Sequence, residues 1–252
     1  SLGLQSASND DLNLLSRRYT FEEFKEKYEL AKKLGFKDIG IDLIFGYPGH
    51  TLDKWKKTLN KVIDLDIQHI SCYSLEIEEG TPYGKLYEID KLNLPAEKEN
   101  RDMYHYTCEY LEENGFKQYE ISNFAKEGYF SMHNSGYWKS EKYLGFGPSA
   151  HSYNLHSRQW NVSNNAEYMR MIECNETPSE IEILNINNKI NEALMLGLRT
   201  SWGFDINKLP KEYFPYLNEL RSNLNVEMEK GNIIQNGNIY LLSTSAKYIS
   251  DS

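Results

Sequence analysis

The sequence has only three cysteines among its 252 residues, Cys72, Cys108 and Cys174, and they lie far apart. Their spacing matches neither a metal-binding motif nor a disulfide framework. We therefore expect each of them to be a small buried hydrophobic residue. An odd number of unpaired thiols favours a reducing compartment, and we expect a cytoplasmic protein.

Strong positive charge and long apolar runs are also missing. The chain carries 28 Lys and Arg against 37 Asp and Glu, which gives a formal net charge of -9. A protein that wraps a phosphate backbone needs many cations on one face, so we expect no nucleic-acid partner. No apolar run approaches the roughly 20 residues of a membrane span, and we recognise no signal peptide. We expect no membrane span.

Several catalytic motifs are absent as well: there is no P-loop, no HExxH motif and no Ser/His/Asp spacing. What the chain does have is 40% hydrophobic residues and 13% aromatic residues, including 19 Tyr. That composition is typical of a globular protein with one large domain, with or without a small appendage.

The first 125 residues alternate between strand and helix patterns. The patterns follow one another, strand first, in the ranges 1–5, 20–35, 38–45, 51–65, 69–77, 95–115 and 117–122. The first helix opens with a capping box at Thr20, and the strands read as largely apolar runs. This alternation predicts right-handed βαβ units in a parallel sheet, open or barrel-like.

Past residue 125 the alternation ends. Helical patterns cover 164–174, 187–198 and 215–230, and an Asn-Gly turn then joins two short strands around Asn236. Two helices followed by a hairpin resemble a winged-helix module. With this acidic charge, a structural or partner-binding wing is favoured over a DNA reader. We predict a domain over residues 1–163 and a smaller one over 164–252.

Polar residues lie near the expected ends of the parallel strands, where ligands bind in α/β sheets. Gln5 closes the first strand and Arg17 follows it; an amide and a guanidinium there could hold a carboxylate or a ribose. Asp42 lies inside an apolar strand, and Glu76 belongs to an acidic cluster after the next one. Structural alternatives are open as well. Arg17 could be a surface arginine, Asp42 could be hydrogen-bonded to a neighbouring loop, and the acidic cluster, above all Glu78 and Glu79, could be a solvated loop.

Residues 133–138 read HNSGYW and combine His133, Tyr137 and Trp138 in a glycine-punctuated segment. A nitrogen ligand beside flat aromatic faces suits a planar macrocycle such as a porphyrin. The alternative is a packed loop whose aromatic residues fill a core and whose histidine caps a backbone group. The other histidines, His50 among them, have no partner pattern and are expected to be structural or surface residues.

Taken together, these segments resemble the oxygen-independent coproporphyrinogen III oxidase family of radical S-adenosylmethionine (SAM) proteins. The resemblance runs in order through SLGLQS, Arg17, IDLIFGYPGHT, HISCYSLEIEEGTP, QYEISNFA, HNSGYW and YLGFGPSAHS. HNSGYW fits the haem-chaperone (HemW) branch better than the oxidase branch. The resemblance implies an α/β fold: the C-terminal part of a partial (β/α) barrel with parallel strands, then a small helical, winged-helix-like domain.

By this resemblance, Gln5, Arg17, Asp42 and Glu76 fall where the family contacts SAM. His133 falls at the position of a haem-iron ligand, with Tyr137 and Trp138 beside the porphyrin. The implied partners are haem or a porphyrin and a haem-acceptor protein.

One departure from the family is large. The CxxxCxxC loop that holds a [4Fe-4S] cluster is absent, so we expect the cluster ligands in further N-terminal residues. Three functions remain open on the sequence. The first is a haem chaperone that binds haem and SAM. The second is the oxidase itself, which decarboxylates coproporphyrinogen III, and the third is a degenerate binding module without chemistry.

Overall fold

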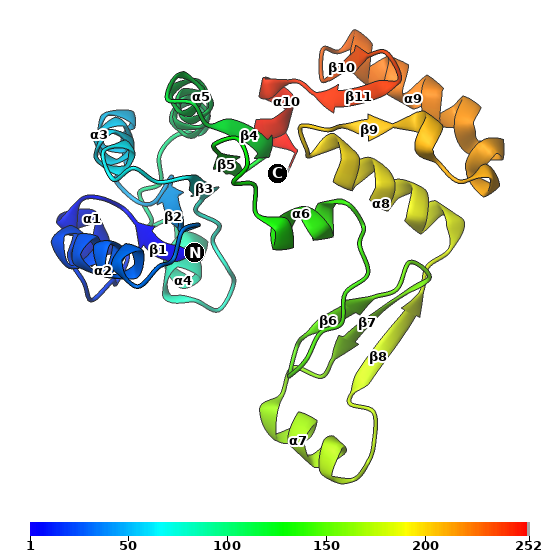
Figure 1. The fold of residues 1–252 in the computed structure, drawn as a ribbon, viewed down its shortest axis with the longest axis horizontal. Coiled ribbons are helices and arrows are strands. Elements are labelled where there is room, and N and C mark those ends of the chain that lie inside the picture. Colours follow the sequence, from blue (N-terminus) through cyan, green and yellow to red (C-terminus); the bar gives the residue numbers. More distant parts are fainter. Residues whose placement is uncertain (251–252) are drawn as a thin grey trace. The chain divides into compact units, whose positions relative to one another are not determined.

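In a computed structural model, residues 1–250 are described, and they form two compact units (Figure 1). The first unit contains Ser1–Phe130 and the C-terminal segment from Thr244, and the second contains Ser131–Ser243. The second unit thus begins at Ser131, whereas the sequence predicts a domain boundary after residue 163. The predicted boundary stays a prediction, because compact units defined by contacts are not the same as domains. Each unit has its own hydrophobic core.

A five-stranded sheet forms the first unit, in the order β1-β2-β3-β5-β4. Its strands are β1 (Leu2–Gln5), β2 (Gly40–Phe45), β3 (His69–Ser74), β4 (Lys117–Glu120) and β5 (Asn123–Ala125). Strands β1, β2 and β3 are parallel, as the sequence predicts, and they form an open sheet rather than a closed barrel. Strand β4 forms within the predicted range 117–122 and runs in the same direction as β3, but it does not pair with β3: the unpredicted strand β5 lies between them and is antiparallel to both. A two-residue connection can join only antiparallel strands.

The helices of this unit are α1 (Asn9–Leu14), α2 (Phe21–Lys33), α3 (Leu52–Ile63), α4 (Pro82–Glu88), α5 (Glu97–Glu113) and α10 (Thr244–Ile249). The predicted capping box is present: Thr20 Oγ1 accepts from Glu23 N, and the Glu23 carboxylate accepts from Thr20 N at 2.7 Å. Two short helices, α1 and α4, are additional to the expected pattern. Both lie in the connections between strands, where the site residues are found.

The two faces of the sheet differ in character. In β2 the alternate residues Ile41, Leu43 and Phe45 are buried and belong to the core with Trp55 of α3. Successive side chains of a strand point to opposite faces, so Asp42 and its neighbour Ile44 face away from that core. Both are half-buried. The sheet therefore presents a partly polar face opposite its hydrophobic one.

The second unit begins with α6 (Met132–Trp138) and an antiparallel sheet in the order β6-β7-β8. Its strands β6 (His151–Tyr153), β7 (Ser157–Asn161) and β8 (Ser179–Ile183) accompany a helix, α7 (Asn165–Glu173). Residues 126–163 are turn-rich and aromatic in sequence, and no strand was predicted there, although β6 and β7 both lie in this range. Short strands with mixed polar and aromatic residues lack the clear alternation that identifies a strand.

The rest of this unit is the expected helix, helix and hairpin arrangement. Its elements are α8 (Ile186–Leu198), β9 (Phe204–Asp205), the 3-10 helices η1 (Ile206–Lys208) and η2 (Lys211–Tyr216), α9 (Leu217–Glu229), β10 (Ile233–Asn236) and β11 (Ile239–Leu242). The predicted Asn-Gly turn joins β10 to β11, with Gly237 at φ 61°. Strand β9 adds a third strand to the hairpin.

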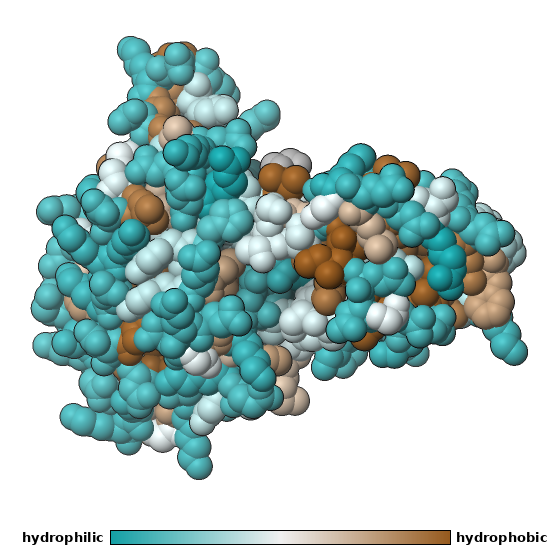
Figure 2. Space-filling model, turned by 90° about the horizontal axis from the view of Figure 1, so that it is seen from above, coloured by the Kyte–Doolittle hydropathy of each residue, from teal (hydrophilic) through white to brown (hydrophobic). Residues whose placement is uncertain are grey.

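Hydrophilic residues dominate the face of the molecule shown in Figure 2, where hydrophobic side chains form separate small patches. Across residues 1–250, the helices are all too short or too polar to cross a membrane.

Candidate cofactor-binding sites

Gln5 ends β1 in an unusual backbone conformation, with φ at 68°. The register with β2 shifts at this point: Gly3 pairs with Asp42, but Gln5 pairs with Leu43. The amide nitrogen Nε2 of Gln5 lies 2.6 Å from where a Cβ at position 3 would be. Glycine at position 3 therefore leaves room for the Gln5 amide on the face of the sheet that carries Asp42.

Asp42 lies within β2, three residues before the strand ends at Phe45, and not beyond the carboxyl edge of the sheet. Its Oδ1 accepts a hydrogen bond of 2.8 Å from the hydroxyl of Ser1. The side chain is half-buried on the partly polar face. A carboxylate in this position can accept further hydrogen bonds from a ligand lying over the sheet.

Arg17 and Glu76 lie in one groove of about 340 Å³ beyond the strand ends. The wall between them includes Ile44, whose neighbour two residues earlier in β2 is Asp42. The groove is held from both sides, because the Tyr83 hydroxyl donates to the carbonyl of Leu14 at 3.0 Å, and the amide of Leu75 donates to the carbonyl of Phe45 at 2.8 Å. Both charged side chains are exposed.

These residues have the right chemistry for SAM. A guanidinium can pair with the methionyl carboxylate, and a carboxylate and an amide can bind ribose hydroxyls or the ammonium group. The structure groups the four predicted residues two by two. Gln5 and Asp42 share one face of the sheet, and Arg17 and Glu76 share the groove next to it.

The cysteines do not fit an iron–sulfur cluster. Within residues 1–250 no three His, Cys, Asp or Glu side chains are placed to hold a metal ion. Burial raises the pKa of the Cys72 thiol well above its usual value and that of Cys108 to about 11, which disfavours the thiolate that a metal needs. Cys72 is the buried hydrophobic residue that the sequence predicts, whereas Cys174 is exposed.

A polar row on the same face of the sheet was not predicted. Ser71 of β3 pairs in register with both Asp42 and Asn123, and Asn123 pairs with Glu120. The Ser71 hydroxyl donates to Asn123 Oδ1 at 2.8 Å, and Asn123 Nδ2 donates to Glu120 at 2.6 Å. All three are buried. The sequence signal was two polar residues three apart in the apolar segment 119–125.

The HNSGYW segment is a helix, α6, and not a loop. His133 and Tyr137 are four residues apart and therefore share one side of it. Their ring centroids lie 4.9 Å apart, and Tyr137 meets Tyr143 edge to face at 4.8 Å. Both members of the pair are exposed. An imidazole next to a phenol ring is thus presented to solvent.

Trp138 is held separately from that pair. Its indole Nε1 donates to Asn134 Oδ1 at 3.0 Å, and the Arg199 guanidinium lies 5.0 Å from the centre of its ring. Asn134 and Trp138 are again four residues apart, so they form a second side of α6. Asn134 and Trp138 are therefore packed against other residues, as in the alternative interpretation of this segment. His133 and Tyr137 are exposed, so a ligand could reach them.

Comparisons with known proteins agree with this picture. Residues 1–62 match the model of the radical SAM superfamily. The chain is 33% identical to the "Heme chaperone HemW" of Bacillus subtilis over 251 residues, which is 99% of this chain and 65% of the relative. It is 38% identical over 151 residues to "Radical S-adenosyl methionine domain-containing protein 1, mitochondrial" of Danio rerio, covering 60% of this chain and 34% of the relative.

The fold is similar to that of coproporphyrinogen III oxidase (HemN) from Escherichia coli, with a TM-score of 0.78 and 17% identity. That superposition covers 99% of this chain and 61% of the solved chain. The chain thus spans less than two thirds of the length of the relatives named here. By its sequence and its fold, it belongs to the HemN-like radical SAM family that includes the HemW haem chaperones.

Proposed function

We propose that the protein containing this chain is a haem chaperone that binds haem and SAM and passes haem to an acceptor protein. The observation that carries the proposal is the 33% identity to a haem chaperone over nearly the whole chain, together with an exposed His133–Tyr137 pair on α6. A cytoplasmic location and the four SAM contacts are part of the same proposal.

For haem, His133 would supply an imidazole nitrogen to the iron, and the Tyr137 ring would lie against the porphyrin. Met132 precedes them and is 89% exposed, so the start of α6 offers apolar surface to the macrocycle. Trp138 would act indirectly, because its hydrogen bond with Asn134 and its contact with Arg199 fix the orientation of the helix.

For SAM, the side chains divide the work. Arg17 would bind the carboxylate, Asp42 the ammonium group or ribose hydroxyls, and Gln5 would bridge polar groups over the same face. SAM supplies radical chemistry only together with a reduced iron–sulfur cluster, and within residues 1–250 no set of side chains fits that cluster. These residues therefore bind and orient the cofactor, and nothing further is assigned to them.

Haem titration of the full-length protein tests the first half of the proposal. We expect a His133→Ala variant to bind haem about tenfold more weakly and to show a shifted Soret band, because an axial ligand is lost. His156→Ala is the matched control, since His156 is also exposed in the second unit but lies outside the motif. Equal affinities and equal spectra for the two variants would remove His133 from the iron.

Calorimetric titration with SAM tests the second half. We expect Asp42→Asn and Arg17→Gln each to weaken binding about tenfold, since each removes one charge-assisted contact. Asp53→Asn is the control, because Asp53 is an exposed carboxylate in the first turn of α3. An affinity that is unchanged in both site variants would contradict the assignment.

The oxidase function remains the alternative, and what favours it is the similarity in fold to HemN. An anaerobic assay with a reconstituted cluster decides between the two: protoporphyrinogen formed from coproporphyrinogen III would overturn the chaperone proposal. A full-length sequence without a CxxxCxxC motif would instead favour a degenerate binding module.

A further inference from the structure

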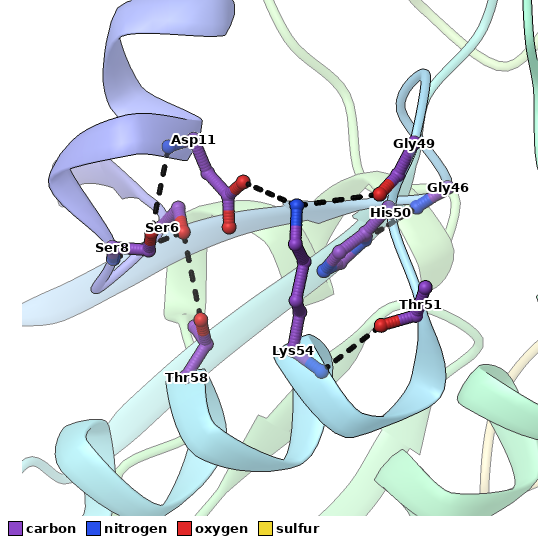
Figure 3. A network of polar contacts seen from close by, with 9 residues as sticks. All are labelled: Ser6, Ser8, Asp11, Gly46, Gly49, His50, Thr51, Lys54 and Thr58. Carbon is purple, nitrogen blue, oxygen red and sulfur yellow. Dashed lines mark hydrogen bonds and ion pairs between the residues drawn. The ribbon is translucent and has the colours of Figure 1, made fainter.

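A cluster of buried polar side chains, which we call the pocket, lies inside the first unit, on the hydrophobic side of the sheet and apart from the proposed cofactor residues. It is bounded by α1, by α3 and by the turn that connects β2 to α3 (Figure 3). The residues around it are Ser6, Asp11, Tyr47, His50, Lys54 and Thr58. Asp11, Tyr47 and His50 are 2%, 0% and 1% exposed, so their polar atoms are shielded from solvent.

Lys54 closes this pocket. Its ammonium group donates to Asp11 Oδ1 at 3.3 Å and to the carbonyl of Gly49 at 3.3 Å, so that one side chain ties α1 to the turn. On the opposite side, the hydroxyls of Ser6 and Thr58 lie 3.5 Å apart. In Figure 3, Asp11 and His50 lie on either side of the Lys54 side chain.

The hydrogen-bonding state of His50 follows from the turn. The backbone N–H of Gly46 donates to Nδ1 at 3.1 Å, so Nδ1 must carry a lone pair. Burial lowers the pKa of His50 to about 4, although the Asp11 carboxylate opposes the shift. The imidazole is therefore neutral near pH 7, and its proton is on Nε2. That donor, although buried, has no protein partner.

Two further buried atoms have no protein partner, Asp11 Oδ2 and the Tyr47 hydroxyl. The rings of Tyr47 and His50 are stacked with centroids 3.9 Å apart, and the Tyr47 hydroxyl is close enough to Asp11 and Ser6 for both to influence its pKa, which burial raises. Each buried polar atom left unsatisfied costs roughly 1–3 kcal/mol. The three atoms belong to neighbouring side chains, since the Tyr47 and His50 rings are stacked and Asp11 acts on both of them, so a single shared partner could satisfy all three.

We propose that a single buried water molecule occupies this pocket, accepting from His50 Nε2–H and donating to Asp11 Oδ2, with its remaining hydrogen bond to the Tyr47 hydroxyl. Water fits because it can donate and accept at once, and buried waters in proteins make about three such bonds. A cation does not fit, since His50 offers a donor and Asp11 is already paired with Lys54.

The hydrated pocket has a consequence for the groove. It holds α1 against the turn, and Arg17 follows α1 with its amide bonded to the carbonyl of Leu12 at 2.9 Å. Loss of the water would loosen the segment that presents Arg17. This consequence rests on the proposed role of Arg17 in binding SAM, whereas the water site itself does not.

A crystal structure of the full-length protein, at a resolution that shows ordered water, is the direct test. The expected result is one density peak about 2.7–3.2 Å from each of the three atoms. A Tyr47 hydroxyl bonded directly to Asp11, with no density between it and His50, would overturn the proposal.

Magnetic relaxation dispersion of water deuterons, which counts long-lived internal waters, gives a second readout in solution. Tyr47→Phe should lose one such water, while Tyr28→Phe should lose none, because the buried Tyr28 hydroxyl bonds to the carbonyl of Asp66. Equal counts in the two variants would contradict the site.

His50 provides the substitution that should preserve the pocket. A Gln side chain can accept from Gly46 and donate to the water, so His50→Gln should keep the long-lived water, whereas His50→Leu should lose it. If SAM binding is unaffected although the water is lost, the link to Arg17 fails but the water site stands. If SAM binds to neither wild type nor variant, it is the proposed function that fails.

Discussion

Polar side chains are positioned differently in the first unit and in helix α6 of the second unit. In the first unit the polar groups are set by tertiary contacts, as in the row from Ser71 through Asn123 to Glu120, and in the pocket that Lys54 closes. In the second unit the pairs of α6 are set locally by their four-residue spacing, and His133 and Tyr137 remain exposed. Substitutions of these buried groups in the first unit should therefore alter stability, and those of the exposed His133–Tyr137 pair should alter ligand binding.

The largest effect is expected at Trp55, which is fully buried and donates from Nε1 to Thr107 Oγ1 at 2.7 Å. Trp55→Ala should destabilise the first unit by about 3–5 kcal/mol, because it leaves a cavity and removes the hydrogen bond that Thr107 Oγ1 accepts, although that hydroxyl still donates to the carbonyl of Met103. Urea denaturation measures the change in the free energy of unfolding, and native-state hydrogen exchange shows which unit loses stability. Met132→Ala, at an exposed position of α6, is the control and should change stability by less than about 0.5 kcal/mol.

A pH effect of up to about 3 kcal/mol is expected from His50, because burial lowers its pKa in the folded protein from the ordinary value of 6.5 to about 4. Between these values the unfolded chain binds a proton and the folded chain does not, so stability falls as pH drops from 6.5 towards 4. The charges facing the imidazole are those of Asp11 and Lys54.

His50→Gln should remove this part of the pH dependence, and denaturation midpoints between pH 7 and pH 4 measure it. Substitution of the exposed His156 by Gln serves as the comparison and should leave the curve unchanged. Parallel curves for wild type and His50→Gln would show that the histidine is not held neutral by the fold.

A smaller loss is expected at Lys54, because Lys54→Met leaves the buried Asp11 carboxylate without its ion-pair partner. The Lys54 side chain is 47% exposed, so solvent moderates the effect, and we expect about 1–2 kcal/mol. Asp11→Asn combined with Lys54→Met should recover part of the loss, since the buried charge is then absent. A double-mutant cycle measures this coupling, and strictly additive losses would contradict the pairing.

The smallest change in stability is expected within α6 itself. Asn134→Ala should cost about 1 kcal/mol by removing the hydrogen bond from Trp138, while Tyr137→Phe should cost less, because Tyr137 is exposed. Haem affinity should rank the positions the other way round. A Tyr137→Ala variant, which removes the ring beside His133, should weaken haem binding more than Asn134→Ala does. Thermal denaturation and titration on the same variants separate the two roles, and a parallel ranking would refute the division of α6 into two sides.

Much of the fold could be predicted because its signals are local. The capping box at Thr20, the apolar runs of β2 and β3 and the Asn-Gly turn each depend on a few neighbouring residues. The short strand β5 between β3 and β4 was missed, because the pairing of a three-residue strand depends on its neighbours in the sheet and not on its own pattern.

The site residues divide in the same way. The HNSGYW motif pointed to His133, but only the helical geometry of α6 shows that Trp138 turns to Asn134 and Arg199. Asp42 lies inside its strand as expected, but only the alternation of buried residues in β2 shows that it is on the face opposite the core.

By itself, the sequence determined the family, the order of the elements and the identity of the polar residues available for ligands. Only the tertiary structure decided which of them meet, because Asp11 comes from a different segment than Tyr47 and His50, just as Ser71 and Asn123 come from different strands. Their partners are set by strand register and by the packing of helices onto the sheet. These are properties of the folded chain as a whole, since a side chain's environment depends on residues distant in sequence.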